Sequence, residues 1–178
     1  MTGTTRVPGN FSFRRPATTT CSLAADTKLD LGWSPSENAW VYVAETELSG
    51  IQQALARRDI FVRDEPLRLL GLAISRADTA LVFPTEFGIF ERGDDETGPV
   101  LAAIQNGLPS GVSARIQLAA ADRNYVNWAR GGNFNPSGQV RVASLRGDGT
   151  GVFGAAVVRN FSVIASSTPV GEPDCPLS

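Results

Sequence analysis

The stretch that decides the fold reads QVRVASL at residues 139–145, RGDGTG at residues 146–151 and VFGAAVVRNFSVI at residues 152–164. Its first and last parts are rich in β-branched and aromatic residues, which are typical of strands. The Gly/Asp-rich segment between them is typical of a tight chain reversal. We therefore expect residues 138–165 to form a β-hairpin. Its second strand would be longer than the usual ~5–6 residues, so it either spans two sheets or pairs beyond its own domain.

The remainder of the chain also favours short strands over helices. Alternation of apolar and polar residues predicts strands at 18–24, 29–33, 39–44, 60–63, 67–75, 79–83, 86–92 and 112–119, with 79–83 and 86–92 as a hairpin. Helical spacing predicts two short helices, at 47–58 and at 99–107. Strands that do not alternate with helices predict a mainly β fold, an antiparallel β-sandwich or β-barrel with one or two short helices.

Three segments differ in composition. Residues 1–17 carry Pro, Gly and Arg, and we expect a flexible N-terminal arm that either docks on a neighbouring subunit or frays. Residues 18–165 form a single β-rich domain, and residues 166–178 form a Pro-rich C-terminal tail. We expect no secretory signal in the polar first twenty residues, and no run of apolar residues is long enough for a membrane span.

The composition disfavours several classes of function. The chain has 178 residues, no histidine and a formal net charge of −2. The absence of histidine removes the commonest general base and the commonest transition-metal ligand. Without clustered basic residues, sequence-specific binding of nucleic acid is not expected. We therefore expect no enzymatic activity, no catalytic residues, no cofactor and no metal, although an enzyme that uses carboxylates alone remains an alternative.

Two local motifs have both a functional and a structural interpretation. Arg146-Gly147-Asp148 spells an integrin-type tripeptide, but glycine between charged residues also suits a hairpin tip. The acidic residues 94–96 could hold a hard cation such as Ca²⁺, but they also suit the start of the helix that follows. We prefer the structural interpretation of both motifs.

Cysteines and aromatic residues offer the remaining candidate features. Cys21 and Cys175 form a candidate disulfide, but sequence spacing does not prove it, and we prefer their interpretation as free thiols or minor core residues. Five aromatic side chains are candidates for a carbohydrate platform, and core packing is the preferred interpretation of their strand patterns. These side chains are Trp33, Trp40, Tyr42, Tyr125 and Trp128.

The strand-loop-strand ending resembles tailed-phage virion proteins, especially tail-tube subunits. The resemblance rests on residues 139–142, 151–158 and 161–163, and the earlier alternation at 70–74, 83 and 86–88 is similar to small head-decoration proteins. It implies a β-sandwich or β-barrel that assembles through strand edges and arms. The Pro/Arg-containing N-terminal arm and the Pro-rich, Cys-bearing tail depart from the tail-tube pattern.

This resemblance predicts a non-enzymatic structural subunit of a virus particle, made in the host cytoplasm and incorporated into the virion. Its expected partners are copies of itself and other virion proteins, with no membrane. The candidate assembly surface lies on the arm and the last strand, at Phe11, Phe13, Arg14, Arg15, Val152, Phe153, Val157 and Phe161. The alternative is a carbohydrate- or ligand-binding β-sandwich module of the adhesin or fibre type.

Overall fold

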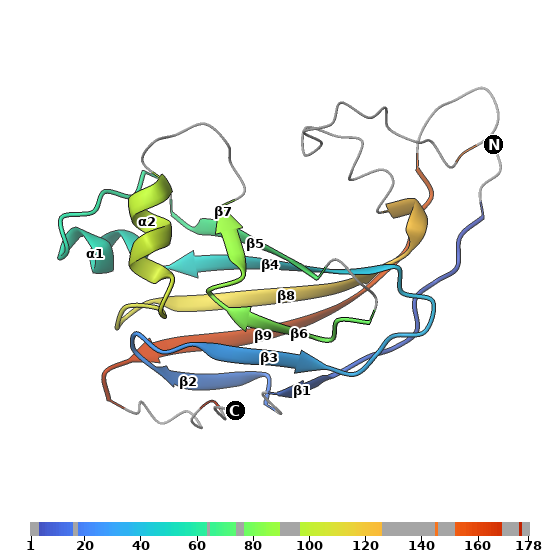
Figure 1. Cartoon of the computed structure of the whole chain (residues 1–178), viewed down its shortest axis with the longest axis horizontal. Helices are drawn as coiled ribbons and strands as arrows, with labels where there is room; N and C mark the ends of the chain where they lie inside the picture. Colours follow the sequence, from blue (N-terminus) through green and yellow to red (C-terminus); the bar gives the residue numbers. More distant parts are fainter. Residues whose placement is uncertain are drawn as a thin grey trace.

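The computed structural model describes residues 4–15, 18–63, 65–73, 77–89, 97–125, 145, 152–168 and 175. These residues form two β-sheets and short helices (Figure 1). The sheets are not closed into a barrel, so the predicted mainly β fold is confirmed in its sandwich-like form.

The described residues contain nine strands and two helices, which carry the labels of Figure 1. The strands are β1 (Phe13–Arg15), β2 (Thr20–Ala24), β3 (Leu29–Trp33), β4 (Val41–Ser49), β5 (Leu67–Ala73), β6 (Ala80–Phe83), β7 (Phe87–Ile89), β8 (Ser113–Ala121) and β9 (Ala156–Ser166). The helices are α1 (Ile51–Ala56) and α2 (Thr97–Ile104).

The larger sheet has the strand order β2-β9-β8-β4-β5-β7. Its neighbouring strands are antiparallel, except that β2 and β9 are parallel. The long pair β4 and β8 runs in register from Val41 opposite Ala121 to Ser49 opposite Ser113. Alternate side chains of both strands are buried, because successive residues of a strand point to opposite faces of the sheet.

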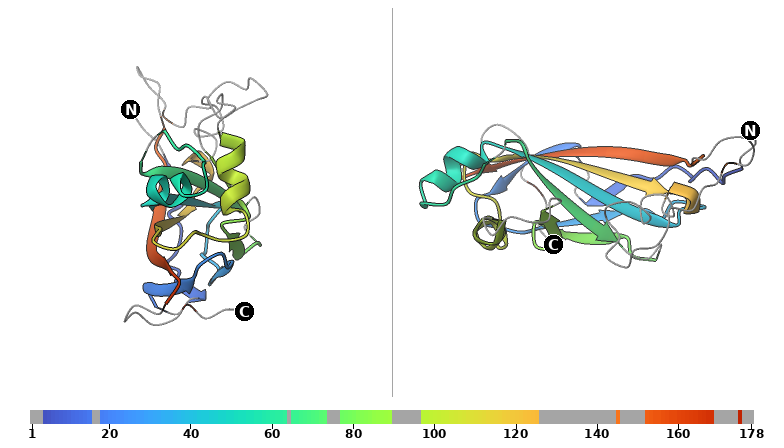
Figure 2. Two further views of the ribbon diagram at one scale, coloured as in Figure 1. Left: turned by 90° about the vertical axis from the view of Figure 1, so that its left-hand side faces the viewer. Right: turned by 90° about the horizontal axis from the view of Figure 1, so that it is seen from above.

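The smaller sheet, in the order β1-β3-β6, packs on the larger one (Figure 2). Aromatic rings join the two layers. The ring of Trp33 on β3 lies 5.2 Å from that of Tyr42 on β4, and the ring of Phe13 on β1 lies 5.8 Å from that of Phe161 on β9. Trp33, Tyr42 and Phe161 are fully buried, so these contacts lie at the centre of the core.

The predicted helix at residues 47–58 is wrong at its start. Strand β4 continues through Ser49, with Leu48 fully buried opposite Leu67 of β5 and Ala114 of β8. Gly50 follows the strand with a φ of 80°, which glycine readily adopts, and α1 begins at the next residue and has only six residues. Pairing with strands on both sides therefore outweighs the helical spacing of the sequence.

The predicted strand at residues 60–63 is also wrong, because this segment is an irregular loop. Val62 is buried, which explains the apolar pattern. The Gln52 side chain of α1 donates hydrogen bonds to the carbonyls of Val62 and Arg63, each at 3.1 Å. A side-chain amide thus occupies acceptors that a neighbouring strand would otherwise use.

The predicted hairpin of residues 79–83 and 86–92 connects two sheets instead of forming one. Strand β6 pairs with β3 in the smaller sheet, whereas β7 pairs with β5 in the larger sheet. The rings of Phe83 and Phe87 are 5.1 Å apart across this connection, so both strands direct an aromatic side chain into the space between the sheets. Residues 90–92 lie outside the described part of the chain.

The helix predicted at 99–107 is present as α2, which begins and ends slightly earlier. Gly107 terminates this segment with a φ of 144°, and its N–H donates to the carbonyl of Ile104 at 3.0 Å. A Cβ at this position would lie 2.2 Å from the backbone nitrogen of Thr27. Glycine is therefore required both by the backbone angle and by the close approach of the β2–β3 turn.

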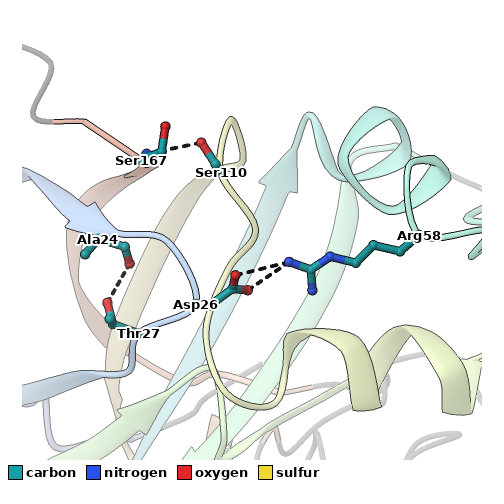
Figure 3. Close-up of polar contacts among 6 residues, drawn as sticks. All are labelled: Ala24, Asp26, Thr27, Arg58, Ser110 and Ser167. Carbon is teal, nitrogen blue, oxygen red and sulfur yellow. Dashed lines mark hydrogen bonds and ion pairs between the residues drawn. The ribbon is translucent and has the colours of Figure 1, made fainter.

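Polar contacts fix that turn against its neighbours (Figure 3). Arg58, just after α1, places Nη2 3.1 Å from each carboxylate oxygen of Asp26. The Thr27 hydroxyl donates to the carbonyl of Ala24, which closes the turn locally. The turn, the end of α1 and the segment after α2 therefore meet at one end of the sandwich.

The described part of the N-terminal arm lies on its own domain. Phe11 is 4% exposed and its ring packs edge-on against that of Tyr42, 5.9 Å away. The Gly9 N–H donates to the carbonyl of Glu37, and β1 pairs with β3. The expectation that Phe11 docks on a neighbouring subunit is therefore wrong, because the domain's own core holds this ring.

Cys21 and Cys175 form a disulfide, so the interpretation as two free thiols is wrong. Their Cα atoms are 5.0 Å apart, and both side chains are buried. The Cys175 N–H also donates to the carbonyl of Ser22 at 2.7 Å. The tail residue is thus attached to β2, the outer strand of the larger sheet, by one covalent bond and one hydrogen bond.

Candidate functional site

Strand β9 confirms the predicted long second strand of the opening stretch. It has 11 residues, and β8 pairs with it from Ala156 to Ile164. The first strand of the predicted hairpin, at 139–145, and the turn at 146–151 lie outside the described residues, apart from Leu145. The same holds for Trp128 and for the acidic residues 94–96.

The two sides of β9 are paired unequally. On one side β8 covers almost the whole strand, whereas on the other β2 pairs only with residues 162–166. The N–H of Ser162 donates to the carbonyl of Thr19, on the side of β2. The N–H of Ala165 donates to the carbonyl of Val112, on the side of β8. Because backbone groups alternate in direction along a strand, those of Ala156, Val158 and Asn160 point toward the side of β2.

No strand among the described residues pairs with β9 on that side between residues 156 and 161. The side chains of residues 156, 158 and 160 are exposed, and Val158 is 38% exposed. The Nε of Arg159, whose side chain lies toward the opposite face, donates to the carbonyl of Phe11 at 2.9 Å, and its Nη1 donates to the carbonyl of Val158, also at 2.9 Å. One carbonyl on the side of β2 therefore already has a hydrogen-bond partner. We call residues 156–161 of β9 the open edge.

The structure divides the predicted assembly residues into three groups. Phe11 and Phe161 are buried in the core, and Phe13 and Val157 are partly buried against it. Val152 is half-buried. The exposed members are Arg14, Arg15 and Phe153. The buried members contribute to packing, so they cannot form a surface for a partner without opening the core.

A groove lies where β4 begins and β8 ends. These strand ends are at the end of the sandwich opposite α1 and α2 (Figure 1). The groove encloses about 480 Å³, and residues of the N-terminal arm, the segment before β4 and the segment after β8 line it. These residues are Thr4, Thr5, Arg6, Asn38, Ala39, Trp40, Asp122, Arg123 and Asn124. We call this site the Trp40 groove.

Strand register brings the residues of the groove together. The N–H of Trp40 donates to the carbonyl of Ala121 at 2.8 Å, which places Trp40 beside the end of β8. The guanidinium carbon of Arg123 then lies 5.3 Å from the centre of the Trp40 ring, a cation–π distance. The Asn124 side chain donates to the carbonyl of Thr4 at 2.8 Å and so holds the arm against the groove.

Asp122 is the buried charged residue of the groove, with 3% of its surface exposed. Its Oδ1 accepts a hydrogen bond from the N–H of Tyr125 at 2.8 Å and caps the helical turn at 123–125. Its Oδ2 is buried and has no hydrogen-bond partner, and the same is true of Oγ1 of Thr5. An unsatisfied buried polar atom costs about 1–3 kcal/mol, so each requires an explanation.

The five aromatic residues considered from the sequence divide between core and surface. Trp33 and Tyr42 are fully buried, which confirms core packing for these two side chains. Core packing is wrong for Trp40 and Tyr125, which are 45% and 39% exposed and lie at the end of the sandwich that carries the groove. Asp122 was missed in the sequence, although an aspartate three residues before a helical N–H is a recognisable capping pattern.

The described residues lack the features of two other classes of site. No cluster of three or more His, Cys, Asp or Glu suited to a metal ion occurs among them. None of the helices in that part of the chain has the length and apolar character to span a membrane. Comparison with protein-family models, with curated proteins and with solved structures finds no match for this chain.

Proposed function

We propose that the protein is a non-enzymatic structural subunit of a virus particle, of the tailed-phage class that its sequence resembles. The subunit assembles with copies of itself and with other virion proteins through β-strand edges. It is made in the host cytoplasm and becomes part of the particle, a role that requires neither sequence-specific nucleic-acid binding nor a membrane. The observation that carries this proposal is the open edge of β9.

An open strand edge can bind another strand through backbone hydrogen bonds, as in β-strand addition. On the open edge, alternate backbone N–H and C=O groups point outward, away from β8, and of these the Val158 carbonyl already accepts a hydrogen bond from Arg159. The exposed side chains are small or uncharged, namely Ala156, Val158 and Asn160. These three side chains carry no charge, so they would not repel an incoming strand. The charged group at this edge is the guanidinium of Arg159, which a partner strand would have to displace from the Val158 carbonyl.

The other sheet edges are less suited to pairing. Strands β1 and β7 have three residues each and β6 has four, and short edge strands offer few hydrogen bonds to a partner. Strand β2 is contacted at Ser22 by the disulfide-bonded residue Cys175. Among the described strands, the open edge of β9 therefore presents the longest continuous run for a neighbouring strand.

The proposal is tested by placing a charge on the open edge. Val158→Lys should abolish or strongly weaken self-assembly, because lysine on a strand edge opposes pairing with another strand. Sedimentation velocity over a concentration series, with negative-stain electron microscopy of the same samples, measures the assembly. The matched control is Gln53→Lys, which adds the same charge at an exposed position of α1.

Assembly of the wild type and of Gln53→Lys, together with monomeric but folded Val158→Lys, would support the proposal. A wild type that stays monomeric at every concentration would contradict it, as would equal assembly of the two lysine variants. Mass spectrometry of purified particles tests the virion assignment separately. Absence of the chain from particles made by its host would refute that assignment, whatever the result for self-assembly.

A further inference from the structure

The Trp40 groove is not needed for strand pairing, and its chemistry points to a second function. Trp40 presents a large flat apolar ring that remains 45% exposed even with Arg123 over it. An isolated aromatic side chain on a surface needs no explanation, but this one lies in a concave site lined by polar groups. An apolar surface with a few converging polar groups is the usual composition of a ligand site.

The guanidinium of Arg123 is already oriented by its contact with the Trp40 ring. A guanidinium held over an aromatic ring can still direct N–H groups to a carboxylate in paired hydrogen bonds. Arg6 adds a second positive charge to the lining, and the only acidic residue in the lining is Asp122. The groove therefore carries a local excess of positive charge, although the whole chain has a net charge of −2.

Asp122 and Thr5 supply polar atoms that the chain leaves without partners. Oδ2 of Asp122 and Oγ1 of Thr5 are both buried, and both residues line the groove. A carboxylate oxygen only accepts hydrogen bonds, whereas a threonine hydroxyl both donates and accepts. Hydroxyl groups of a ligand would satisfy both atoms, once side chains of the groove wall move enough to admit them.

A sugar acid combines the features that these groups recognise. Its ring has an apolar face of C–H groups that can stack on Trp40, and its hydroxyls suit Asp122 and Thr5. Its carboxylate suits the N–H groups of Arg123. A nucleic-acid strand would also stack on tryptophan, but strand binding also needs a positively charged path along the backbone, and two arginines in one groove do not provide it.

We propose that the Trp40 groove binds saccharides that carry a carboxylate, such as uronic or sialic acids, with the sugar ring on Trp40 and the carboxylate on Arg123. This binding does not depend on assembly through β9. A subunit with such a site would attach to acidic glycans, so the same chain would combine a structural and a recognition role.

Isothermal titration calorimetry with the full chain tests the site. The probes are trigalacturonate and sialyllactose, each compared with an uncharged counterpart, the methyl ester of trigalacturonate and lactose. At least one acidic probe should bind, and its uncharged counterpart should bind about tenfold more weakly or not at all. Trp40→Ala and Arg123→Gln should each weaken binding of the acidic probe by about tenfold or more.

Matched controls separate the groove from general surface effects. Phe61→Ala removes an aromatic side chain that is 69% exposed after α1, at the other end of the sandwich. Arg115→Gln removes an exposed arginine from β8. Both controls should bind the acidic probe as the wild type does, and circular dichroism should show that all four variants are folded.

Several outcomes would overturn the proposal. These are the absence of binding by both acidic probes, equal binding of the acidic and uncharged probes, and unchanged binding in Trp40→Ala and Arg123→Gln. A single-stranded oligonucleotide that binds more tightly than the acidic saccharides would also overturn it in favour of nucleic acid. A monomeric wild type would leave this result unaffected, so the two proposals fail independently.

Discussion

Replacing Cys175 with alanine should lower the free energy of unfolding by about 2–5 kcal/mol. The disulfide joins residues that are 154 positions apart, so it closes a loop that includes most of the domain. For a loop of this length, the loss of chain entropy in the unfolded state corresponds to about 5 kcal/mol. Measured values are usually lower than this limit, because unfolded chains retain structure.

Both truncations remove a buried sulfur, but the substitution at Cys175 is preferable, because Cys21 is fully buried within strand β2 whereas Cys175 is 5% exposed and lies outside the strands. The Cys175 N–H bond to Ser22 is a backbone contact that alanine can still make. The expected loss therefore comes mainly from the covalent link. Urea unfolding followed by circular dichroism, without reductant, measures the difference between Cys175→Ala and the wild type.

A reducing agent provides the internal control. In its presence the wild type and Cys175→Ala should unfold with free energies that agree within about 1 kcal/mol, since neither then has the link. Equal stability of the two proteins without reductant would refute the entropic reasoning. Two reactive thiols in the unreduced wild type, revealed by alkylation after unfolding, would refute the disulfide itself.

Two further predictions concern the turn between β2 and β3. Gly107→Ala should destabilise the fold by more than Gly111→Ala, because a Cβ at 107 would lie 2.2 Å from Thr27, whereas one at 111 would meet no atom within 4 Å. Both positions have positive φ, so Gly111→Ala measures the backbone cost alone, about 1–2 kcal/mol. Equal losses of stability for the two variants in thermal unfolding would contradict the clash at residue 107. Arg58→Ala should change stability by only about 0–1 kcal/mol, because its ion pair with Asp26 is exposed; a larger loss that persists in high salt would show that the pair is not screened.

The sequence predicts the strands of the larger sheet well where one face is buried. Only the first part of β4 is predicted, because the sequence favours a helix from residue 47. Strands β8 and β9 lie close to their predicted positions. In these strands local propensity and burial favour the same structure, so alternation alone is sufficient. The two short helices are found near their predicted positions for the same reason.

Predictions fail where tertiary contacts compete with a local pattern. Leu48 fits a helical stripe, yet pairing with β5 and β8 on both sides makes it part of β4. Val62 fits a strand, yet Gln52 satisfies its carbonyl from a helix. Phe83 and Phe87 fit a hairpin, yet each lies in a different sheet, because one apolar side of each strand must face the shared core.

The Trp40 groove illustrates how the sequence can indicate one residue of a site and miss its partners, because Trp40 is a candidate for a carbohydrate platform whereas Asp122 and Arg123 are not singled out. Trp33 and Trp40 both lie near strands, and neither sequence context shows that one is fully buried while the other is exposed. That difference depends on position relative to the sheet. Trp33 ends a strand in the core, whereas Trp40 precedes the first paired residue of β4.

The register between β4 and β8 then determines which residues Trp40 meets. Because Val41 pairs with Ala121, the next residues after β8, Asp122 and Arg123, lie beside Trp40 although about eighty positions separate them in the chain. A shift of one residue in this register would reverse the face of every side chain on the strand. The combination of groups in the groove is therefore a property of strand pairing, which the sequence does not show even where it singles out Trp40.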